Sequence, residues 1–287
     1  MRLPAVAGAF YEASAERLRR QVRDCFTHRL GPGRVPEPRP GPRRLVGLVV
    51  PHAGYVYSGA IAAHAYAALA ADGLRPSYIV LGPNHRGSGA PLALTRHDFQ
   101  TPLGVMRCDA ALFEALSKPP LEDDVLAHRG EHSIEVQLPF LQVLAPEAAF
   151  VPICMAFQEY EPASDVGRVV ASAAAGRDVV LIASSDFTHV GAQYYQLPPH
   201  GKTAPAFAAD QDAKAIERIL ALDPKGLATR VREDEISMCG YGPVTSMLVA
   251  AKRLGATEAK LLRYGTSSDV SGDEDTAVGY GAIAVYR

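Results

Sequence analysis

Two histidines and one cysteine stand where a protein could hold a metal ion or move protons. His52 follows the apolar run LVGLVV, and His85 follows SYIVLG. Cys239 lies in ISMCGYGP, directly before a run that is typical of a helix. Imidazole and thiolate are ligands that Zn²⁺, Fe²⁺ and copper accept, whereas Mg²⁺ and Ca²⁺ prefer oxygen. The residue types therefore indicate a transition-metal site, although the chain contains no HExxH or CxxC motif that would support it locally.

Asp186 and His189 repeat this placement after a third apolar run, DVVLIASS. Capping of a turn would explain one such histidine by itself. Three runs that end in this way favour a shared site, because open α/β sheets build their sites at the carboxyl ends of their strands. In such a site His189 would serve as a base or proton donor, oriented by Asp186.

His132 lies in the segment AHRGEHSIEVQLPFLQVL, for which two interpretations stay open. On a helix, Glu131 and Glu135 would share one face with His132 beside them. His132 would then point into the cleft as a base or as a group that polarises a substrate. Alternatively, this is a solvated first turn whose acidic residues are favoured by the helix dipole.

Cys239 has three possible roles. A helix N-terminus favours a thiolate, which suits a metal ligand or a nucleophile. A hydrolase that pairs Cys239 with His189 is the less favoured form of the second role, because it leaves His52 and His85 without a task. The third role is a buried structural thiol, which we expect for Cys25, Cys108 and Cys154.

Strands and helices alternate along the chain, which predicts an α/β fold with a mostly parallel central sheet flanked by helices. The segment at 31–44 is rich in proline, glycine and arginine and predicts a linker. The apolar runs that predict strands lie at 45–50, 77–82, 149–154 and 178–183, with a shorter one at 91–97 and two last ones at 259–268 and 277–287. The helical patterns lie at 14–27, 58–71, 131–144, 163–175, 205–222 and 240–254.

Composition excludes several classes of function. The chain has 287 residues, 48% of them hydrophobic, which is enough for one large domain. Its net charge of −2 gives no support for binding nucleic acid or an anionic membrane. No apolar run approaches 18 residues and no signal peptide is evident, so we expect a cytoplasmic protein.

A series of ordered sequence blocks resembles the Memo family, whose prokaryotic members are called AmmeMemoRadiSam system protein B. The resemblance spans nearly the whole chain and implies one Memo-like domain over residues 1–287. It rests on the blocks AVAGAFYE, PHAGYVYSG, LGPNHRG, EHSIEVQLPFLQ, SSDFTHVG, CGYGP and VGYGAI.

The family is similar in fold to class III extradiol dioxygenases of the LigB type, which cleave catechol rings with non-haem iron. The resemblance implies metal ligands at His52, His85 and Cys239, with Asp186 and His189 beside the metal. His132 matches the histidine of the EHSIE block. It further implies an oxidoreductase that uses iron or copper, with zinc as a third candidate. A cysteine in place of the dioxygenase carboxylate softens the site and is open to oxidation, so ring cleavage is not expected.

The resemblance also implies an alternative, in which a binding protein uses the dioxygenase-like cleft without catalysis. Its ligand would be a peptide or a small aromatic or phenolic molecule. We expect four aromatic residues to line that pocket: Phe10, Tyr11, Tyr55 and Tyr57. The family name implies a radical-SAM enzyme and an AMMECR1-like protein as partners.

Overall fold

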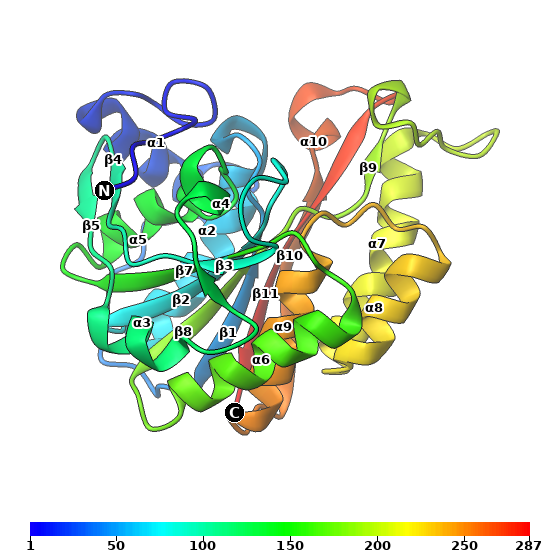
Figure 1. Ribbon diagram of the computed structural model, residues 1–287. Coiled ribbons are helices and arrows are strands. Elements are labelled where there is room, and N and C mark those ends of the chain that lie inside the picture. The colour runs from blue at the N-terminus through cyan, green and yellow to red at the C-terminus, as the bar shows by residue number, and fades with distance from the viewer.

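A mixed β-sheet forms the centre of the computed structural model, which describes residues 1–287 (Figure 1). Its strands are ordered β10-β11-β1-β8-β2-β7-β3-β6, and β9 pairs with β11. A separate ribbon contains β4 and β5. The strands are β1 Leu45–Val50, β2 Ser77–Pro83, β3 Leu92–Leu94, β4 Phe99–Thr101, β5 Gly104–Met106, β6 Glu122–Asp123, β7 Ala149–Met155, β8 Val179–Ser184, β9 His189–Val190, β10 Glu258–Thr266 and β11 Ala277–Tyr286.

The four central strands are parallel and carry the apolar runs of the sequence. β1 pairs with β8, β8 with β2, and β2 with β7, all in parallel. On the two sides of this centre, β11 and β3 join as antiparallel strands. β1 and β2 are buried along their whole length, as strands covered on both faces must be. The predicted α/β architecture is therefore confirmed, with antiparallel strands added outside a parallel centre.

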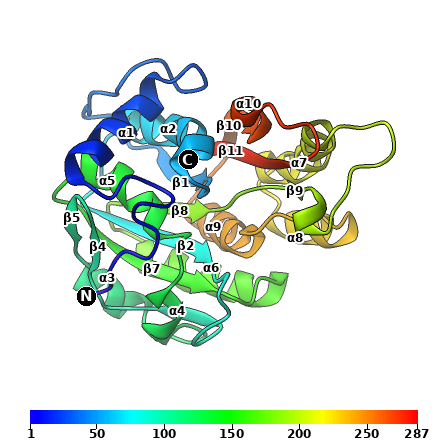
Figure 2. The same ribbon diagram turned by 90° about the horizontal axis from the view of Figure 1, so that it is seen from above.

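Helices cover both faces of the sheet, as Figures 1 and 2 show. Residues alternate between the faces along each strand, so Val50 packs with α1, α2 and α5 while Val49 packs with α3, α6, α8 and α9. No helix has both the length and the apolar character needed to cross a membrane. The helices are α1 Ala15–Thr27, α2 Tyr55–Asp72, α3 Ala110–Leu116, α4 Leu126–Arg129, α5 Leu138–Leu144, α6 Tyr160–Ala174, α7 Ala204–Leu220, α8 Pro224–Glu233, α9 Tyr241–Arg253 and α10 Ser268–Ser271, with 3₁₀ turns η1 Glu135–Gln137 and η2 Ala192–Tyr194.

The predicted helix over 131–144 is wrong at its beginning. Residues 131–134 form turns between α4 and η1, and the α-helix α5 starts only at Leu138. The Glu131 carboxylate accepts hydrogen bonds from the backbone N–H groups of His132 and Ser133. Such local bonds offer the backbone an alternative to a helix. Consequently Glu131 and Glu135 do not share a helix face, and they bind different partners.

Several short elements were not expected from the sequence. These are the helices α3, α4, α8 and α10, the strands β6 and β9, the β4–β5 ribbon and the 3₁₀ turn η2. The pattern at 205–222 corresponds to α7, and a second helix begins directly after it at Pro224. The other predicted strands and helices are confirmed, with bounds that differ by a few residues.

Arg2 and Glu135 form a buried ion pair that attaches the N-terminal segment to the body of the protein. The two side chains are 1% and 0% exposed. Arg2 also donates to the backbone carbonyls of His128 and Glu131. Glu135 further accepts from Tyr11 and from the backbone N–H groups of Ala5 and Val6. The pair therefore fixes both the N-terminal segment and the turn at 131–134.

We expect Arg2→Ala to lower the free energy of unfolding by about 3–5 kcal/mol, because it leaves the Glu135 carboxylate buried without its partner. Urea denaturation at neutral pH measures this change. Arg20→Ala is the control, since Arg20 pairs with Glu16 on the exposed surface of α1. That variant should stay within about 0.5 kcal/mol of the parent protein. Equal midpoints for the two variants would contradict the role given to the buried pair.

Asp212 on α7 is a buried acid that fixes the loop between β8 and β9. Its carboxylate accepts from the backbone N–H and hydroxyl of Thr188, and from the hydroxyl of Tyr264 at 2.7 Å. Burial raises the pKa of Asp212 from 3.8 to about 6, although these hydrogen bonds oppose the shift.

The raised pKa of Asp212 predicts a pH dependence of stability. Because the pKa is higher in the folded state, protonation of Asp212 stabilises the folded protein at a pH below the unfolded value of 3.8. This contribution to the free energy of unfolding is lost as the pH rises through about 6. The loss amounts to roughly 3 kcal/mol. Asp212→Asn lacks this loss, so its stability relative to the parent protein should rise between pH 4 and pH 7. Chemical denaturation across that range measures the difference, and a difference independent of pH would refute the prediction.

Candidate metal centre

Three adjacent parallel strands deliver the candidate residues to one edge of the sheet. β1, β8 and β2 are neighbours, and His52, Asp186 and His85 each lie two residues beyond the end of one of them. Cys239 lies in the loop before α9, where Gly240 packs against β8. A Cβ on Gly240 would lie 2.4 Å from the backbone oxygen of Ser184, so only glycine permits this approach.

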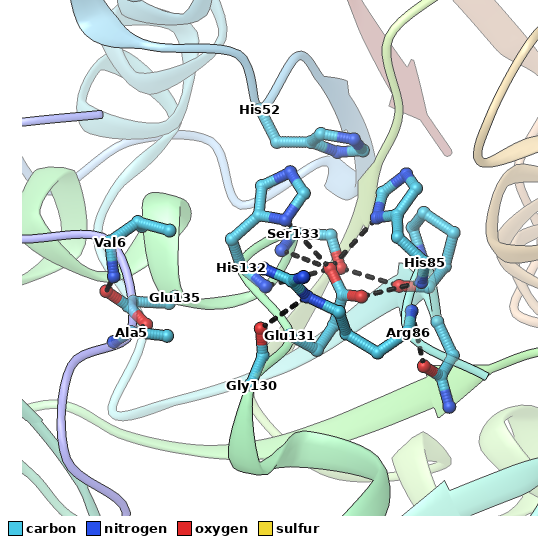
Figure 3. Close-up of polar contacts among 12 residues, drawn as sticks. Ala5, Val6, His52, His85, Arg86, Gly130, Glu131, His132, Ser133 and Glu135 are labelled. Atoms are coloured by element: carbon cyan, nitrogen blue, oxygen red, sulfur yellow. Dashed lines mark hydrogen bonds and ion pairs between the residues drawn. The ribbon is translucent and has the colours of Figure 1, made fainter. Parts of the chain in front are cut away.

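The ligand atoms of His52, His85 and Cys239 lie within 4.8 Å of one another, so these residues could hold a metal ion. The Cys239 Sγ is 3.2 Å from His52 Nε2. The imidazole of His132 joins them, and its ring stacks on that of His85 with centroids 4.8 Å apart. Figure 3 shows the three histidine rings facing one another above Glu131.

Ser184 determines which nitrogen of His52 is free. A serine hydroxyl has one hydrogen to donate and two positions that accept. The hydroxyl of Ser184 donates to the carbonyl of Ser133 and accepts from the amide of Gln137. Its remaining contact is His52 Nδ1 at 2.9 Å, which must therefore carry the hydrogen. His52 Nε2 is left with a lone pair directed toward Cys239, as a metal ligand requires.

Glu131 orients the other two histidines in the same way. Its carboxylate accepts from His85 Nδ1 at 3.0 Å and from the backbone N–H of His85 at 2.6 Å. His132 Nδ1 lies 3.3 Å from the same carboxylate oxygen. Carboxylates commonly hold metal-binding histidines in this manner. The group of His85, Glu131 and His132 also lies within 4.8 Å and could hold a metal itself.

Two histidines of the site, His52 and His132, have lowered pKa values. Burial lowers the pKa of His52 well below its ordinary value, and the neighbouring histidines lower it further. Burial lowers the pKa of His132 to about 4, although the Glu131 charge opposes this. Burial would raise the pKa of Glu131, but its hydrogen bond with His85 and the histidine charges outweigh burial and bring it to about 2. The neutral imidazoles of His52 and His132 therefore lie beside the ionised carboxylate of Glu131.

The prediction that the helix end favours a free thiolate at Cys239 is wrong. Burial and the charge of Asp186 raise the pKa of its thiol well above the ordinary value, although the backbone N–H of Asp186 donates to the sulfur. Cys239 contacts His52 and not His189, so the pair that a cysteine hydrolase would need is not formed. Cys25 and Cys154 are buried as expected, whereas Cys108 is partly exposed.

Asp186 and His189 border the same cavity but do not contact each other through a hydrogen bond. His189 Nδ1 lies 3.0 Å from the carbonyl of Ser237, which orients the ring in place of Asp186. Asp186 instead accepts from the backbone N–H of His52 at 2.7 Å. Burial raises the pKa of Asp186, and the charge of His189 opposes the shift.

A cavity of about 470 Å³ opens over the three histidines. Of the four aromatic residues expected in its wall, Phe10 and Tyr57 line it. Tyr11 and Tyr55 do not, because their hydroxyls bind Glu135 and the carbonyl of Val136 inside the core. Tyr194 and Tyr280 contribute instead.

Comparison with known proteins decides the family. A family model described as Memo-like protein matches residues 2–284. The chain belongs to the Memo family. A MEMO1 family protein of Methanopyrus kandleri is 46% identical over 292 residues, which cover 100% of this chain and 99% of that protein. A MEMO1 family protein of Methanothermobacter thermautotrophicus is 43% identical over 289 residues, with 99% and 100% covered.

The crystal structure of the uncharacterized protein JW3007 from Escherichia coli K12 has a similar fold. The TM-score is 0.51 and the identity 18%, with 84% of this chain and 99% of that chain covered. At this identity the likeness concerns the fold alone.

Three residues that support this Memo site escaped the sequence analysis. Ser184 orients His52, Ser237 orients His189, and Glu131 acts on two histidines although the sequence indicated only a helix face. Ser184 lies near the end of an apolar run in the sequence, but the partners of its hydroxyl come from distant segments. No local signal in the sequence identifies them.

We expect Glu131→Gln to weaken metal binding by about 10- to 100-fold, because an amide cannot accept the same set of N–H donors or favour Nδ1–H on both histidines. Competition with a chromophoric chelator measures the affinity. Glu161→Gln, at an exposed position of α6, is the control and should bind metal like the parent protein. Unchanged affinity in a folded Glu131→Gln protein would contradict the orienting role.

Proposed function

We propose that this Memo protein is an oxidoreductase built around one transition-metal ion held by His52, His85 and Cys239. Iron and copper are the preferred metals and zinc is the third. The supporting observation is that the three ligand atoms lie within 4.8 Å of one another, with both histidines lining a cavity. Iron and copper are preferred because thiolate and imidazole together suit them and because both change oxidation state.

The donor set fits such an ion. His52 and His85 each have Nδ1 occupied by a protein acceptor, so Nε2 is free to bind. The thiol of Cys239 has a raised pKa without metal and would lose its proton on binding, which makes uptake dependent on pH. When bound, the ion would supply a Lewis acid and a redox centre next to the cavity.

Around that centre the protein would bind a substrate and move protons. His189 faces the cavity with Nδ1 against the Ser237 carbonyl, so its Nε2 would take or return a proton. The outer nitrogen of the neutral His132 would accept a hydrogen bond or a proton from a substrate hydroxyl, because its Nδ1–H is directed at Glu131. Asp186 would position His52 and Cys239, since it contacts the backbone of one and the sulfur of the other.

A second candidate is a binding protein that uses the cavity without catalysis. The size of the cavity and its aromatic wall support it, because small-molecule sites have this volume and lining. A phenolic molecule or a peptide side chain is the ligand that we propose for it. We also propose a radical-SAM enzyme and an AMMECR1-like protein as system partners, which family membership supports.

Elemental analysis of protein purified without chelators tests the metal directly. We expect close to one equivalent of iron, copper or zinc, and its loss in Cys239→Ser and His52→Ala. Loading with Co²⁺ should give a thiolate charge-transfer band that Cys239→Ser removes. Protein that is metal-free and takes up none of Fe²⁺, Cu⁺ or Zn²⁺ would refute the proposal.

The same Cys239 variant separates the two candidates. An oxidoreductase should lose turnover together with its metal. A binding protein should lose the metal and keep the affinity for its ligand, measured by calorimetry with the phenols used in the following section.

A further inference from the structure

The cavity over the metal centre has an unusual distribution of charge. Its lining contains the carboxylates of Asp186 and Asp273 and no lysine or arginine. Arg86 influences His132 through its charge but lies outside the lining, where its Nε donates to the carbonyl of Gly130 (Figure 3). A ligand here therefore meets carboxyl groups at both the floor and the rim and no lysine or arginine.

Aromatic rings supply much of the remaining surface. Phe10, Tyr57, Tyr194 and Tyr280 line the cavity. Tyr57 and Tyr194 are 41% and 39% exposed, so part of each ring is open to a ligand. Aromatic faces attract cations and pack against flat rings.

Tyr280 is a buried residue whose hydroxyl has no hydrogen-bond partner in the protein. The residue is 2% exposed and lies on β11, where its side chain lines the cavity. Buried tyrosine hydroxyls ordinarily find a hydrogen-bond partner within the protein, as Tyr11, Tyr55 and Tyr66 do here. Tyr280 has none, yet its oxygen is not sealed off in the core. A ligand atom in the cavity would complete its bonding.

The position of Tyr280 gives the ligand a direction. Tyr280 follows Gly279, whose carbonyl and backbone N–H bond with Phe187 and Thr188, the two residues after Asp186. Tyr280 therefore lies on the side of the cavity that carries Asp186. Asp273 is exposed and stands at the rim, next to α10.

We propose that the cavity binds a phenol that carries a positive or neutral side chain, with Tyr280 donating to the phenolic oxygen and Asp273 facing the side chain. The inference rests on the proposed function only in using the same cavity, and it adds the class of substrate. A phosphate or carboxylate would lose its hydration here without gaining a cation, which is costly in a buried site. A protonated amine would instead meet aromatic faces and a carboxylate.

Calorimetry with three para-substituted phenols, which differ mainly in the charge of the side chain, tests the charge preference. The probes are tyramine, which is a cation, 4-ethylphenol, which is neutral, and 3-(4-hydroxyphenyl)propionate, which is an anion. We expect affinity to fall in that order for the metal-free protein. Asp273→Asn should bring tyramine close to 4-ethylphenol, while Asp275→Asn, an exposed neighbour outside the cavity, should change nothing.

The role of Tyr280 is tested by removing its hydroxyl from the protein and, separately, the phenolic hydroxyl from the ligand. Tyr280→Phe should weaken tyramine by about 3- to 10-fold, the value of one hydrogen bond, and leave phenethylamine unchanged because that probe has no hydroxyl. Tyr286→Phe is the matched control, since it lies on the same strand but outside the cavity. Equal weakening of both probes by Tyr280→Phe would refute a bond to the phenolic oxygen.

The use of metal-free and Zn²⁺-loaded protein separates this inference from the proposed function. Tightest binding of the propionate by the metal-free protein, or no binding of any probe at millimolar concentration, would overturn the substrate class while leaving the metal centre intact. If no metal is taken up but the order of the three phenols holds, the metal proposal fails and the substrate class stands.

Discussion

The site depends on the buried carboxylate of Glu131. It accepts hydrogen bonds from the backbone of His85, His132 and Ser133 and from the His85 ring, and it also lies against the His132 ring. An ionised carboxylate away from water is stable only when it is paired and bonded in this way. These bonds interrupt the helix that the sequence pattern favours and turn two imidazoles toward the cavity. Local backbone structure and metal geometry are thus consequences of one charge.

This carboxylate is fixed by a second layer of buried polar groups. Arg2 donates to the carbonyl of Glu131 and pairs with Glu135, which in turn holds the N-terminal segment. That segment places Phe10 against the His132 ring, with centroids 4.8 Å apart. A polar network of this kind is favourable only when all members are satisfied, and it then enforces one arrangement. The candidate metal centre therefore depends on Arg2, which precedes Glu131 by 129 positions.

The remaining geometry comes from the register of the parallel sheet. Val50 of β1 is opposite Ser184 of β8, so the chain continues into His52 beside the hydroxyl that orients its ring. On the other side, Leu81 of β2 is opposite Ala183. Strands that end at the same level deliver their next residues to one place. The cavity at this edge contains no lysine or arginine.

The sequence by itself determined the α/β architecture, the four central strands and the residues that come together at their ends. Apolar runs and strand ends are local patterns, and a parallel sheet converts them into neighbours by a general rule. The sequence could not reveal that Ser184 and Ser237 orient the histidines or that Cys239 faces His52, because these contacts join segments far apart in the chain. Only the structure showed that Glu131 bonds the backbone of His132 and Ser133 and also holds His85, which keeps residues 131–134 out of a helix. Burial, which only the tertiary structure shows, raises the pKa of the Cys239 thiol.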